Sequence, residues 1–244
     1  MGGIMSLKTD IFNAVNSIID NQMEINEVVK VPDISDSSLT FGLTGQRFIN
    51  VCFYIDMRGS TAVLEKHNAN VVIKIHKAFF IVVLKVVNNN GGEVRSFNGD
   101  SLLAFFPGNN STSIESAIKS AMQVKYLLLV DENCLNKKIK QKYDTEIDIG
   151  IGLDIGTTTA AKIGQSGSNN QDLIWIGSNV NHSVKISDDR KATNNIGITS
   201  RLYDNLTNNT KFHNNTTNMW QRSFYSYNNH SEVVYITAYH WTVS

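Results

Sequence analysis

The sequence predicts an α+β fold with a ferredoxin-like βαββαβ core, in which helices cover one face of an antiparallel sheet. Residues 47–56 are almost wholly apolar, as expected of a central strand that is covered on both faces. The residues Asn98-Gly99-Asp100 predict a hairpin bend, because Asn and Gly tolerate a positive φ. Residues 145–156 alternate in polarity with a period of two, which predicts a strand with one exposed face that carries Asp148 and Asp154.

The other elements follow from hydrophobic periodicity and from residues that end helices. Residues 1–45 are interpreted as an N-terminal helical extension and a connector, because apolar residues recur at helical spacing there and Pro32 interrupts a polar segment. The catalytic domain then covers residues 46–244. Helices are predicted at 60–67, 70–88, about 112–133 and 179–189; strands at 93–97, 101–106, 158–164, 172–177 and 232–241; a strand and then a helix within 195–206; and a charged connector at 137–144.

The composition excludes several classes of protein. The 244 residues carry 22 basic and 22 acidic side chains, so the chain lacks the positive charge typical of nucleic-acid-binding proteins. Only Cys52 and Cys134 are present, which is consistent with a reducing cytosol and predicts no disulfide framework. No apolar run approaches the ~18 residues that a membrane-spanning helix needs, and the first residues do not have the pattern of a secretory signal. We therefore expect a cytoplasmic protein.

Two carboxylates form the strongest candidate for a metal site. Asp56 ends an apolar strand and is followed by Gly59, Ser60 and Thr61, which are small residues at a helix start. Asp100 comes from the bend of a separate hairpin. Carboxylate oxygens suit Mg²⁺ or Mn²⁺, and the free backbone N–H groups of a helix start suit phosphate oxygens. The pair therefore predicts a metal-bound triphosphate, with two metal ions possible.

Four motifs in this order resemble the catalytic domain of the class III nucleotidyl cyclases, over about four-fifths of the chain. They are YIDMRGST (54–61), FNGDSLLAFF (97–106), IDIGIGLDIG (147–156) and IWIGSNVNHSVKI (174–186). The resemblance implies cyclisation of a nucleoside triphosphate with release of pyrophosphate. It also implies two Mn²⁺ or Mg²⁺ ions per site, and a head-to-tail homodimer in which each site is shared between the subunits.

The resemblance also implies roles for individual residues. Asp56, Asp100 and the backbone carbonyl of Met57 match the metal ligands. The segment Arg58-Gly59-Ser60-Thr61 matches the turn that binds the triphosphate. Asn181 matches the Asn that orients the ribose. Lys185 stands where the family usually has the Arg that stabilises the transition state, so that the charge is kept and the bidentate fork is lost.

The positions that read the base depart from the purine cyclases. Ser96 and Ile174, followed by Trp175, replace the pair of residues that recognises a purine. This pattern most resembles the bacterial antiphage pyrimidine cyclases of the Pycsar systems, which also have a Tyr before the first Asp, here Tyr54. That resemblance implies formation of the 3′,5′-cyclic monophosphate of UTP or CTP, sensed by a separate effector protein. We expect Tyr54, Ser96, Ile174 and Trp175 to shape the base pocket, and UTP is slightly favoured over CTP.

Other functions stay open at this stage. The chain could be an adenylate or guanylate cyclase of class III, or a cyclase-derived module that binds nucleotide without catalysis. A diguanylate cyclase is disfavoured, because Gly91-Gly92 precedes the strand and does not form the hairpin bend. The six histidines show no metal-ligand spacing. No residue for the terminal phosphates is identified; Lys211 and Arg222 are candidates only. The activating signal is not visible in the sequence.

Overall fold

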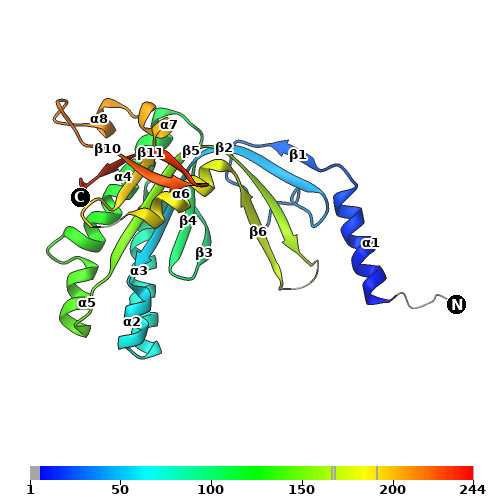
Figure 1. The fold of residues 1–244 in the computed structure, drawn as a ribbon, viewed down its shortest axis with the longest axis horizontal. Helices are drawn as coiled ribbons and strands as arrows, with labels where there is room; N and C mark the ends of the chain where they lie inside the picture. Colours follow the sequence, from blue (N-terminus) through cyan, green and yellow to red (C-terminus); the bar gives the residue numbers. More distant parts are fainter. Residues whose placement is uncertain (1–5, 166, 168, 191, 244) are drawn as a thin grey trace. The chain divides into compact units, whose positions relative to one another are not determined.

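The computed structural model describes residues 6–165, 167, 169–190 and 192–243. The described residues divide into two compact units. The first comprises the described residues of 6–28, 32–47 and 159–176; the second comprises those of 29–31, 48–158 and 177–243. Two long strands, β2 (Thr44–Arg58) and β5 (Asp148–Gly164), contribute one segment to each unit (Figure 1). The proposed boundary near residue 46 stays a prediction.

The first unit consists of one helix and two short strand pairings. Helix α1 (Leu7–Ile19) begins at Ser6, whose side chain accepts a hydrogen bond from the Thr9 backbone, and none of its residues is buried. Strand β1 (Glu24–Glu27), which the sequence analysis missed, pairs in parallel with the start of β2. Strand β6 (Gln171–Ile176) pairs antiparallel with the end of β5. The predicted strand 158–164 is therefore the end of β5 and not a separate element.

In the second unit the strands form one sheet in the order β10-β11-β7-β5-β2-β4-β3. Most neighbours whose register is resolved pair antiparallel, whereas β5 and β7 are parallel. The strands not yet given are β3 (Glu93–Asn98), β4 (Ser101–Pro107), β7 (Ile196–Thr199), β10 (Gln221–Tyr227) and β11 (His230–Thr237). A separate small hairpin pairs β8 (Phe212–His213) with β9 (Thr217–Asn218).

One face of this sheet carries the main hydrophobic core. Alternate residues of the strands, such as Ile55 on β2 and Leu102 on β4, pack against apolar residues of the helices, such as Phe79 and Ile118. The helices of this face are α2 (Ser60–Lys66), α3 (Ala69–Asn89), α4 (Ser111–Lys125), its π-helical continuation η1 (Tyr126–Val130), and α5 (Leu135–Tyr143).

The expectation of a charged connector at 137–144 is wrong, because α5 occupies most of that segment. Ile139 is 3% exposed and anchors the helix in the core, which outweighs the surrounding lysines. Asp144 ends the helix at a positive φ of 47°.

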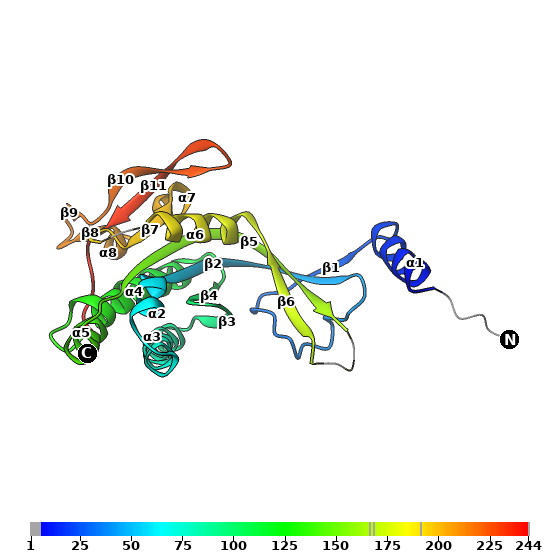
Figure 2. The ribbon, with the colours of Figure 1, turned by 60° about the horizontal axis from the view of Figure 1, so that its bottom comes forward.

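Helix α6 (Ser178–Asp189) packs on the opposite face of the sheet, as Figure 2 shows. It comes very close to β5: a Cβ added at Gly152 would lie 2.0 Å from the carbonyl oxygen of Ser183, and one at Gly150 would lie 2.2 Å from that of Ser187. The predicted exposed face of residues 145–156 is therefore wrong. The alternating glycines leave room for a helix backbone and do not face solvent.

Asp154 does not face solvent either. It is fully buried and accepts hydrogen bonds from Thr199 and from the guanidinium of Arg201, on helix α7 (Ser200–Asp204). These partners satisfy its carboxylate inside the fold. Asp148 is partly exposed and accepts a hydrogen bond of 2.6 Å from the side chain of Asn195.

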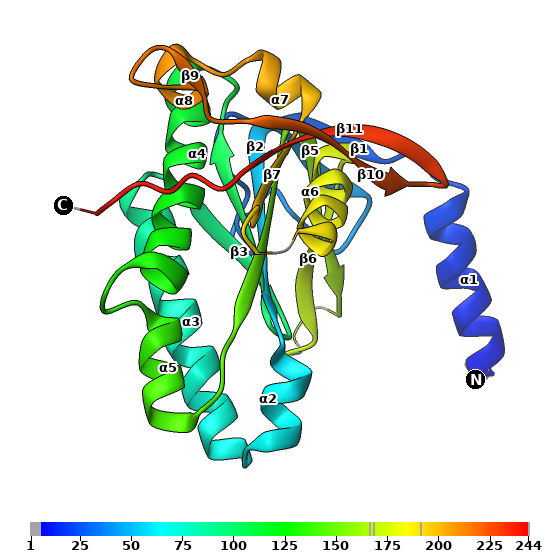
Figure 3. The ribbon, with the colours of Figure 1, turned by 60° about the vertical axis from the view of Figure 1, so that its left-hand side comes forward.

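The C-terminal segment returns across the helical layer. It passes over α4 (Figure 3), where the backbone N–H of Trp241 lies 3.4 Å from the carbonyl oxygen of Met122. None of the described helices is long and apolar enough to cross a bilayer. Cys52 and Cys134 are both buried free thiols, and burial raises the pKa of the Cys52 thiol. The expectation that no disulfide forms between these two residues is confirmed.

Candidate active site

The strand register brings Asp56 and Asp100 together. Asp56 on β2 lies opposite Ser101 on β4, so Asp100, one residue earlier in the hairpin bend, lies beside the end of β2. The backbone N–H of Met57 donates a 3.2 Å hydrogen bond to the carbonyl oxygen of Asp100. Two segments that are more than 40 residues apart in the sequence thus present both carboxylates at one end of the sheet.

The electrostatics of Asp56 show how closely the two carboxylates interact. The pKa of Asp56 is raised from 3.8 to about 6, mainly by burial and further by the negative charge of Asp100 and a hydrogen bond with it. Asp188 on α6 contributes a smaller increase. Arg58 opposes these effects, with its Nε 3.7 Å from a carboxylate oxygen of Asp56. Two carboxylates that repel each other in a half-buried place form an arrangement that a divalent cation stabilises.

The donor set suits a hard cation with oxygen ligands, such as Mg²⁺ or Mn²⁺. Two carboxylates and nearby backbone carbonyls would leave positions for water and for phosphate oxygens, as Mg²⁺ sites bound to nucleotides usually do. Among the residues that the structure describes, no three His, Cys, Asp or Glu side chains come together as a metal-binding group. Two carboxylates leave coordination positions open, which suits a cation that arrives with its substrate.

Two of the residues predicted to read the base, Tyr54 and Ser96, share one face of the sheet with Asp56. Tyr54 lies two residues before Asp56 and pairs with Leu103, which in turn pairs with Ser96 on β3. Tyr54 and Ser96 therefore flank Leu103 on the face opposite the main core. The Tyr54 hydroxyl donates a 2.7 Å hydrogen bond to the Ser101 hydroxyl, which donates to the carbonyl oxygen of Asn98. This chain of hydrogen bonds fixes the tyrosine ring next to the aspartates.

The turn after Asp56 leads into a cavity of about 350 Å³. Gly59 has a φ of 84°, a conformation that favours glycine, and α2 begins directly after it without a side-chain cap. The cavity is lined by Ser60, Thr61 and Leu64 on α2, Val72 and His76 on α3, and Gly99 and Asp100 in the hairpin bend. Arg58 turns away from this cavity lining, because its guanidinium donates to the carbonyl oxygen of Ser187 on α6. Its predicted contact with phosphate stays a prediction.

Helix α6 presents Asn181 and Lys185 to solvent. The two residues are four positions apart, so they share one face of the helix, and both are exposed. Lys185 Nζ lies 4.0 Å from a carboxylate oxygen of Asp188. The start of the helix is anchored by Asn179, which is fully buried and donates to the side chains of Asn50 and Thr158 at 3.0 Å each. This buried network holds the exposed pair in a fixed position relative to β2 and β5.

Ile174 and Trp175 belong to the first unit. They lie on β6, where they pair with Ala161 and Ala160 of β5, and both are partly exposed. The aspartates and α6 belong to the second unit. A role for Ile174 and Trp175 in the base pocket stays a prediction.

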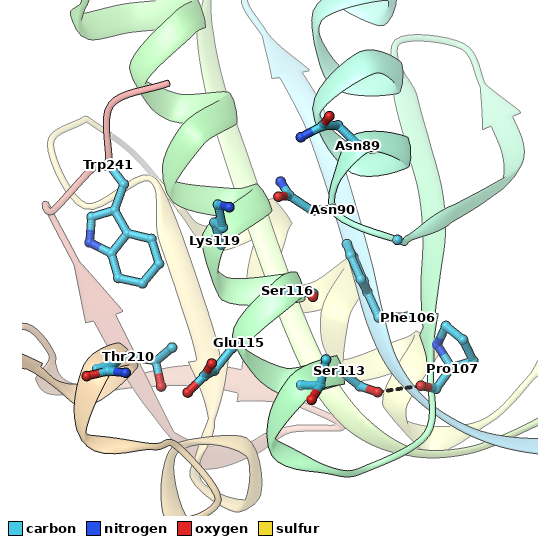
Figure 4. A pocket seen from close by; sticks show the side chains of 13 residues that line it. Asn89, Asn90, Phe106, Pro107, Ser113, Glu115, Ser116, Lys119, Thr210 and Trp241 are labelled. Atoms are coloured by element: carbon cyan, nitrogen blue, oxygen red, sulfur yellow. Dashed lines mark hydrogen bonds between the residues drawn. The ribbon is translucent and has the colours of Figure 1, made fainter. Parts of the chain in front are cut away.

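A larger cavity of the second unit lies elsewhere. It measures about 600 Å³ and is lined at the end of β4 by Phe106 and Pro107, the far end of that strand from Asp100. Figure 4 shows Phe106 and Trp241 on opposite sides of it, with Lys119 and Glu115 projecting from α4. Its volume exceeds that of the cavity beside Asp100, but it holds no paired carboxylates. We therefore assign the candidate active site by its chemistry and not by its size.

Three residues near the site were missed by the sequence analysis. Asn179 lies two residues before Asn181 within the motif 174–186, so the motif could have selected it, whereas Asp188 follows the motif on α6 and no residue spacing points to it. His76 lines the cavity next to Asp100. No sequence signal places His76 there, because the cavity forms only where α2, α3 and the hairpin bend meet.

Comparison with known proteins gives a consistent result for the whole chain. No family model matches the sequence. A uridylate cyclase of Xanthomonas perforans is 26% identical over 241 residues, which cover 98% of this chain and 100% of the relative. A uridylate cyclase of Rhodovulum sp. (strain MB263) is 27% identical over 242 residues, which cover 96% of this chain and 97% of the relative.

Solved structures share the fold at lower sequence identity. The guanylyl cyclase Cya2 superposes with a TM-score of 0.67 at 19% identity, covering 81% of this chain and 95% of that protein. The adenylyl cyclase CyaB from P. aeruginosa gives a TM-score of 0.64 at 18% identity, over 79% and 95%. A class III adenylyl cyclase-like ATP-binding protein from Pseudomonas aeruginosa gives 0.62 at 18% identity, over 85% and 45%.

Proposed function

This chain has the fold of the class III nucleotidyl cyclases and is related to the uridylate cyclases, and from this premise we propose that it cyclises a pyrimidine nucleoside triphosphate. The product is the 3′,5′-cyclic monophosphate of UTP, or of CTP, with pyrophosphate as the leaving group. The observation that carries the proposal is the pairing of Asp56 with Asp100 at one end of the sheet, where the charge of Asp100 helps to raise the pKa of Asp56.

Divalent cations fit this pair, and two ions are proposed per site. Asp56, Asp100 and the backbone carbonyl of Met57 would hold them. Bound there, Mg²⁺ or Mn²⁺ supplies charge neutralisation at the phosphates and makes the ribose 3′-hydroxyl more acidic. The chain orients the substrate: the turn at Gly59, Ser60 and Thr61 offers backbone N–H groups to phosphate oxygens. Positioning and electrostatic stabilisation account for most of the catalysis of phosphoryl transfer.

The residues on α6 are proposed to act on the site of a second subunit. Asn181 and Lys185 are exposed on one face of a rigidly anchored helix. A homodimer with shared sites would bring Asn181 to the ribose and Lys185 to the charge that develops at the α-phosphate. Lys185 would act there as a point charge, whereas an arginine would donate two parallel hydrogen bonds.

The choice of a pyrimidine rests on the chemistry around Tyr54 and Ser96. Both lie on the aspartate face of the sheet and offer hydroxyl groups, and neither supplies the charged partner that a purine cyclase uses. A site that leaves the polar edge of a base unpaired discriminates against that base by orders of magnitude. The names of the curated relatives favour UTP over CTP.

A wider role follows from the same relationship. The cyclic nucleotide would be a second messenger in bacterial antiphage defence, made in the cytoplasm and sensed by a separate effector protein. The competing function is a nucleotide-binding module without catalysis, which the fold also accommodates, since one structural neighbour is described as an ATP-binding protein. The intact aspartate pair favours the enzyme.

The test is product identification with purified protein and Mn²⁺. Each of ATP, GTP, CTP and UTP is incubated separately, and the products are identified by mass spectrometry. We expect cyclic UMP, or cyclic CMP, to exceed the cyclic purine nucleotides, and activity to be lost in Asp56→Ala and Asp100→Ala. A clear preference for ATP or GTP would refute the pyrimidine assignment, and turnover in both variants would refute the site.

A further inference from the structure

A histidine shares the cavity that would receive the triphosphate. His76 on α3 lines the 350 Å³ cavity together with Ser60 and Thr61 at the start of α2 and with Asp100 in the hairpin bend. Val72, one helical turn before His76, lines the same cavity, so this face of α3 looks into it. Among the seven lining residues, His76 is the one whose side chain can carry a positive charge.

The orientation of the imidazole ring follows from one hydrogen bond. Nδ1 of His76 lies 2.8 Å from the carbonyl oxygen of Val72. A carbonyl only accepts, so Nδ1 carries the proton and donates, and Nε2 is the second polar atom of the ring. The ring also lies against Phe80, with centroids 6.5 Å apart. The histidine is therefore held in place from both its backbone side and its apolar side.

Two other roles for this histidine fit less well. As a metal ligand it would have to join Asp56 and Asp100, but the described part of the chain holds no group of three such side chains. A purely structural role would be fulfilled by the hydrogen bond to Val72 alone. Such a role would not require the partly buried ring to lie on the wall of the cavity. An imidazolium donates from both nitrogens, which suits an anion in the cavity.

The two cations considered earlier for the terminal phosphates have other partners. Lys211 Nζ lies 4.1 Å from the centre of the Tyr203 ring, and the guanidinium of Arg222 lies 4.7 Å from that of Phe224. Both rings belong to elements after α6, and neither residue lines the cavity beside Asp100. Within one chain, neither Lys211 nor Arg222 therefore supplies the positive charge beside this cavity, and another residue must bind the outer phosphates there.

We propose that His76 binds the terminal phosphates of the substrate and of the pyrophosphate product as an imidazolium, with Nε2 donating a hydrogen bond to a phosphate oxygen while Nδ1 keeps its hydrogen bond to the carbonyl oxygen of Val72. This inference rests on the proposed function. It assigns to α3 a residue that contacts the part of the substrate distant from the base. The contact is equally available before and during the reaction, so it contributes to binding more than to the chemical step.

Binding of inorganic tripolyphosphate tests the proposal without requiring turnover. Calorimetric titrations with Mn²⁺ present compare the wild type with His76→Gln, His76→Lys and the control His230→Gln, which changes an exposed histidine at the start of β11. We expect about tenfold weaker binding in His76→Gln, a factor that corresponds to about 1.4 kcal/mol. His76→Lys should retain most of the affinity, and the control should match the wild type.

A second measurement uses the wild-type chain alone. In ¹⁵N-histidine-labelled protein with Mg²⁺, tripolyphosphate should shift the Nε2 resonance of His76 and leave that of His230 in place. With nucleotide, His76→Gln should raise KM about tenfold and change kcat by less than about threefold, the pattern of lost uniform binding.

Unchanged affinity in folded His76→Gln, no binding by the wild type, or an unshifted His76 resonance would each overturn the assignment. Absence of any cyclic product from the wild type would instead refute the proposed function, since the tripolyphosphate titration does not depend on turnover.

Discussion

Replacing Asp56 by Asn should separate stability from function. At about pH 8, above its raised pKa, the Asp56 carboxylate of the metal-free protein is charged, and the negative charge of Asp100 disfavours that charge. The rise in the pKa of Asp56 from 3.8 to about 6 corresponds to about 3 kcal/mol, at 1.36 kcal/mol per pKa unit. The carboxylate is 21% exposed, so screening by solvent reduces this value. We expect Asp56→Asn to raise the free energy of unfolding by about 1–2 kcal/mol.

The pH dependence has a defined sign. Because the folded state holds the Asp56 proton more tightly than the unfolded state, the wild type loses stability as the pH rises from 3.8 to about 6. The difference between Asp56→Asn and the wild type should therefore be present at about pH 8 and absent at about pH 3.5, below both pKa values. Urea unfolding at both pH values, with a chelator present, measures it.

Adding Mn²⁺ should reverse the order of stability. The wild type gains stability in proportion to its affinity for the cation, and Asp56→Asn should gain little. The control is Asp204→Asn, which changes an exposed aspartate in α7 and should behave as the wild type under all conditions. If Asp56→Asn were less stable than the wild type at about pH 8 without metal, the argument for mutual repulsion would be wrong.

Three further outcomes follow from the structure. Gly152→Ala should lower the free energy of unfolding by about 1–3 kcal/mol, because the added Cβ would lie 2.0 Å from a backbone oxygen of α6; urea unfolding checks this. Lys185→Ala should reduce kcat at least about 100-fold, because it removes a charge that stabilises the transition state. The melting temperature should not change, because the Lys185 side chain is 58% exposed. Deleting residues 1–20 should change the free energy of unfolding by less than about 0.5 kcal/mol, because no residue of α1 is buried; a larger loss would reveal contacts of that helix.

Much of the fold could be predicted from local patterns. The apolar strand through residues 47–56, the Asn98-Gly99 bend and the long helix after residue 69 all occur as expected, because each combines strong periodicity with a clear end signal. The prediction of a class III cyclase fold is confirmed by the structural neighbours. Helix α5 was missed because its apolar content is low: Ile139 is buried, and Leu135 and Tyr143 pack partly buried against the core.

The glycines of β5 show why periodicity can mislead. Alternation of Ile with Gly at 149–152 has the pattern of a half-exposed strand, yet both faces are covered. A missing side chain makes room either for solvent or for a backbone, and the sequence does not distinguish these cases. The sequence likewise does not show whether Asp154 faces solvent or a buried partner, because its partner Arg201 lies 47 residues further along the chain.

The candidate site likewise contains residues that the sequence predicts and residues that it does not predict. Asp56, Asp100 and Asn181 stand out in sequence because short motifs surround them. Their spatial arrangement follows from strand register, which brings the two aspartates together as expected. His76 and Asp188 depend on how helices pack against the sheet, a long-range property that residue spacing does not encode. Whether Ile174 and Trp175 complete the base pocket stays a prediction.

One measurement addresses the central claim most directly: identification of the nucleotide product made from each of the four nucleoside triphosphates with Mn²⁺, by the wild type and by Asp56→Asn and Asp100→Asn. We predict a cyclic pyrimidine monophosphate and pyrophosphate from the wild type, and loss of both products in each variant. Undiminished turnover in either variant, or no cyclic nucleotide from any of the four substrates, would contradict a site built on these two aspartates.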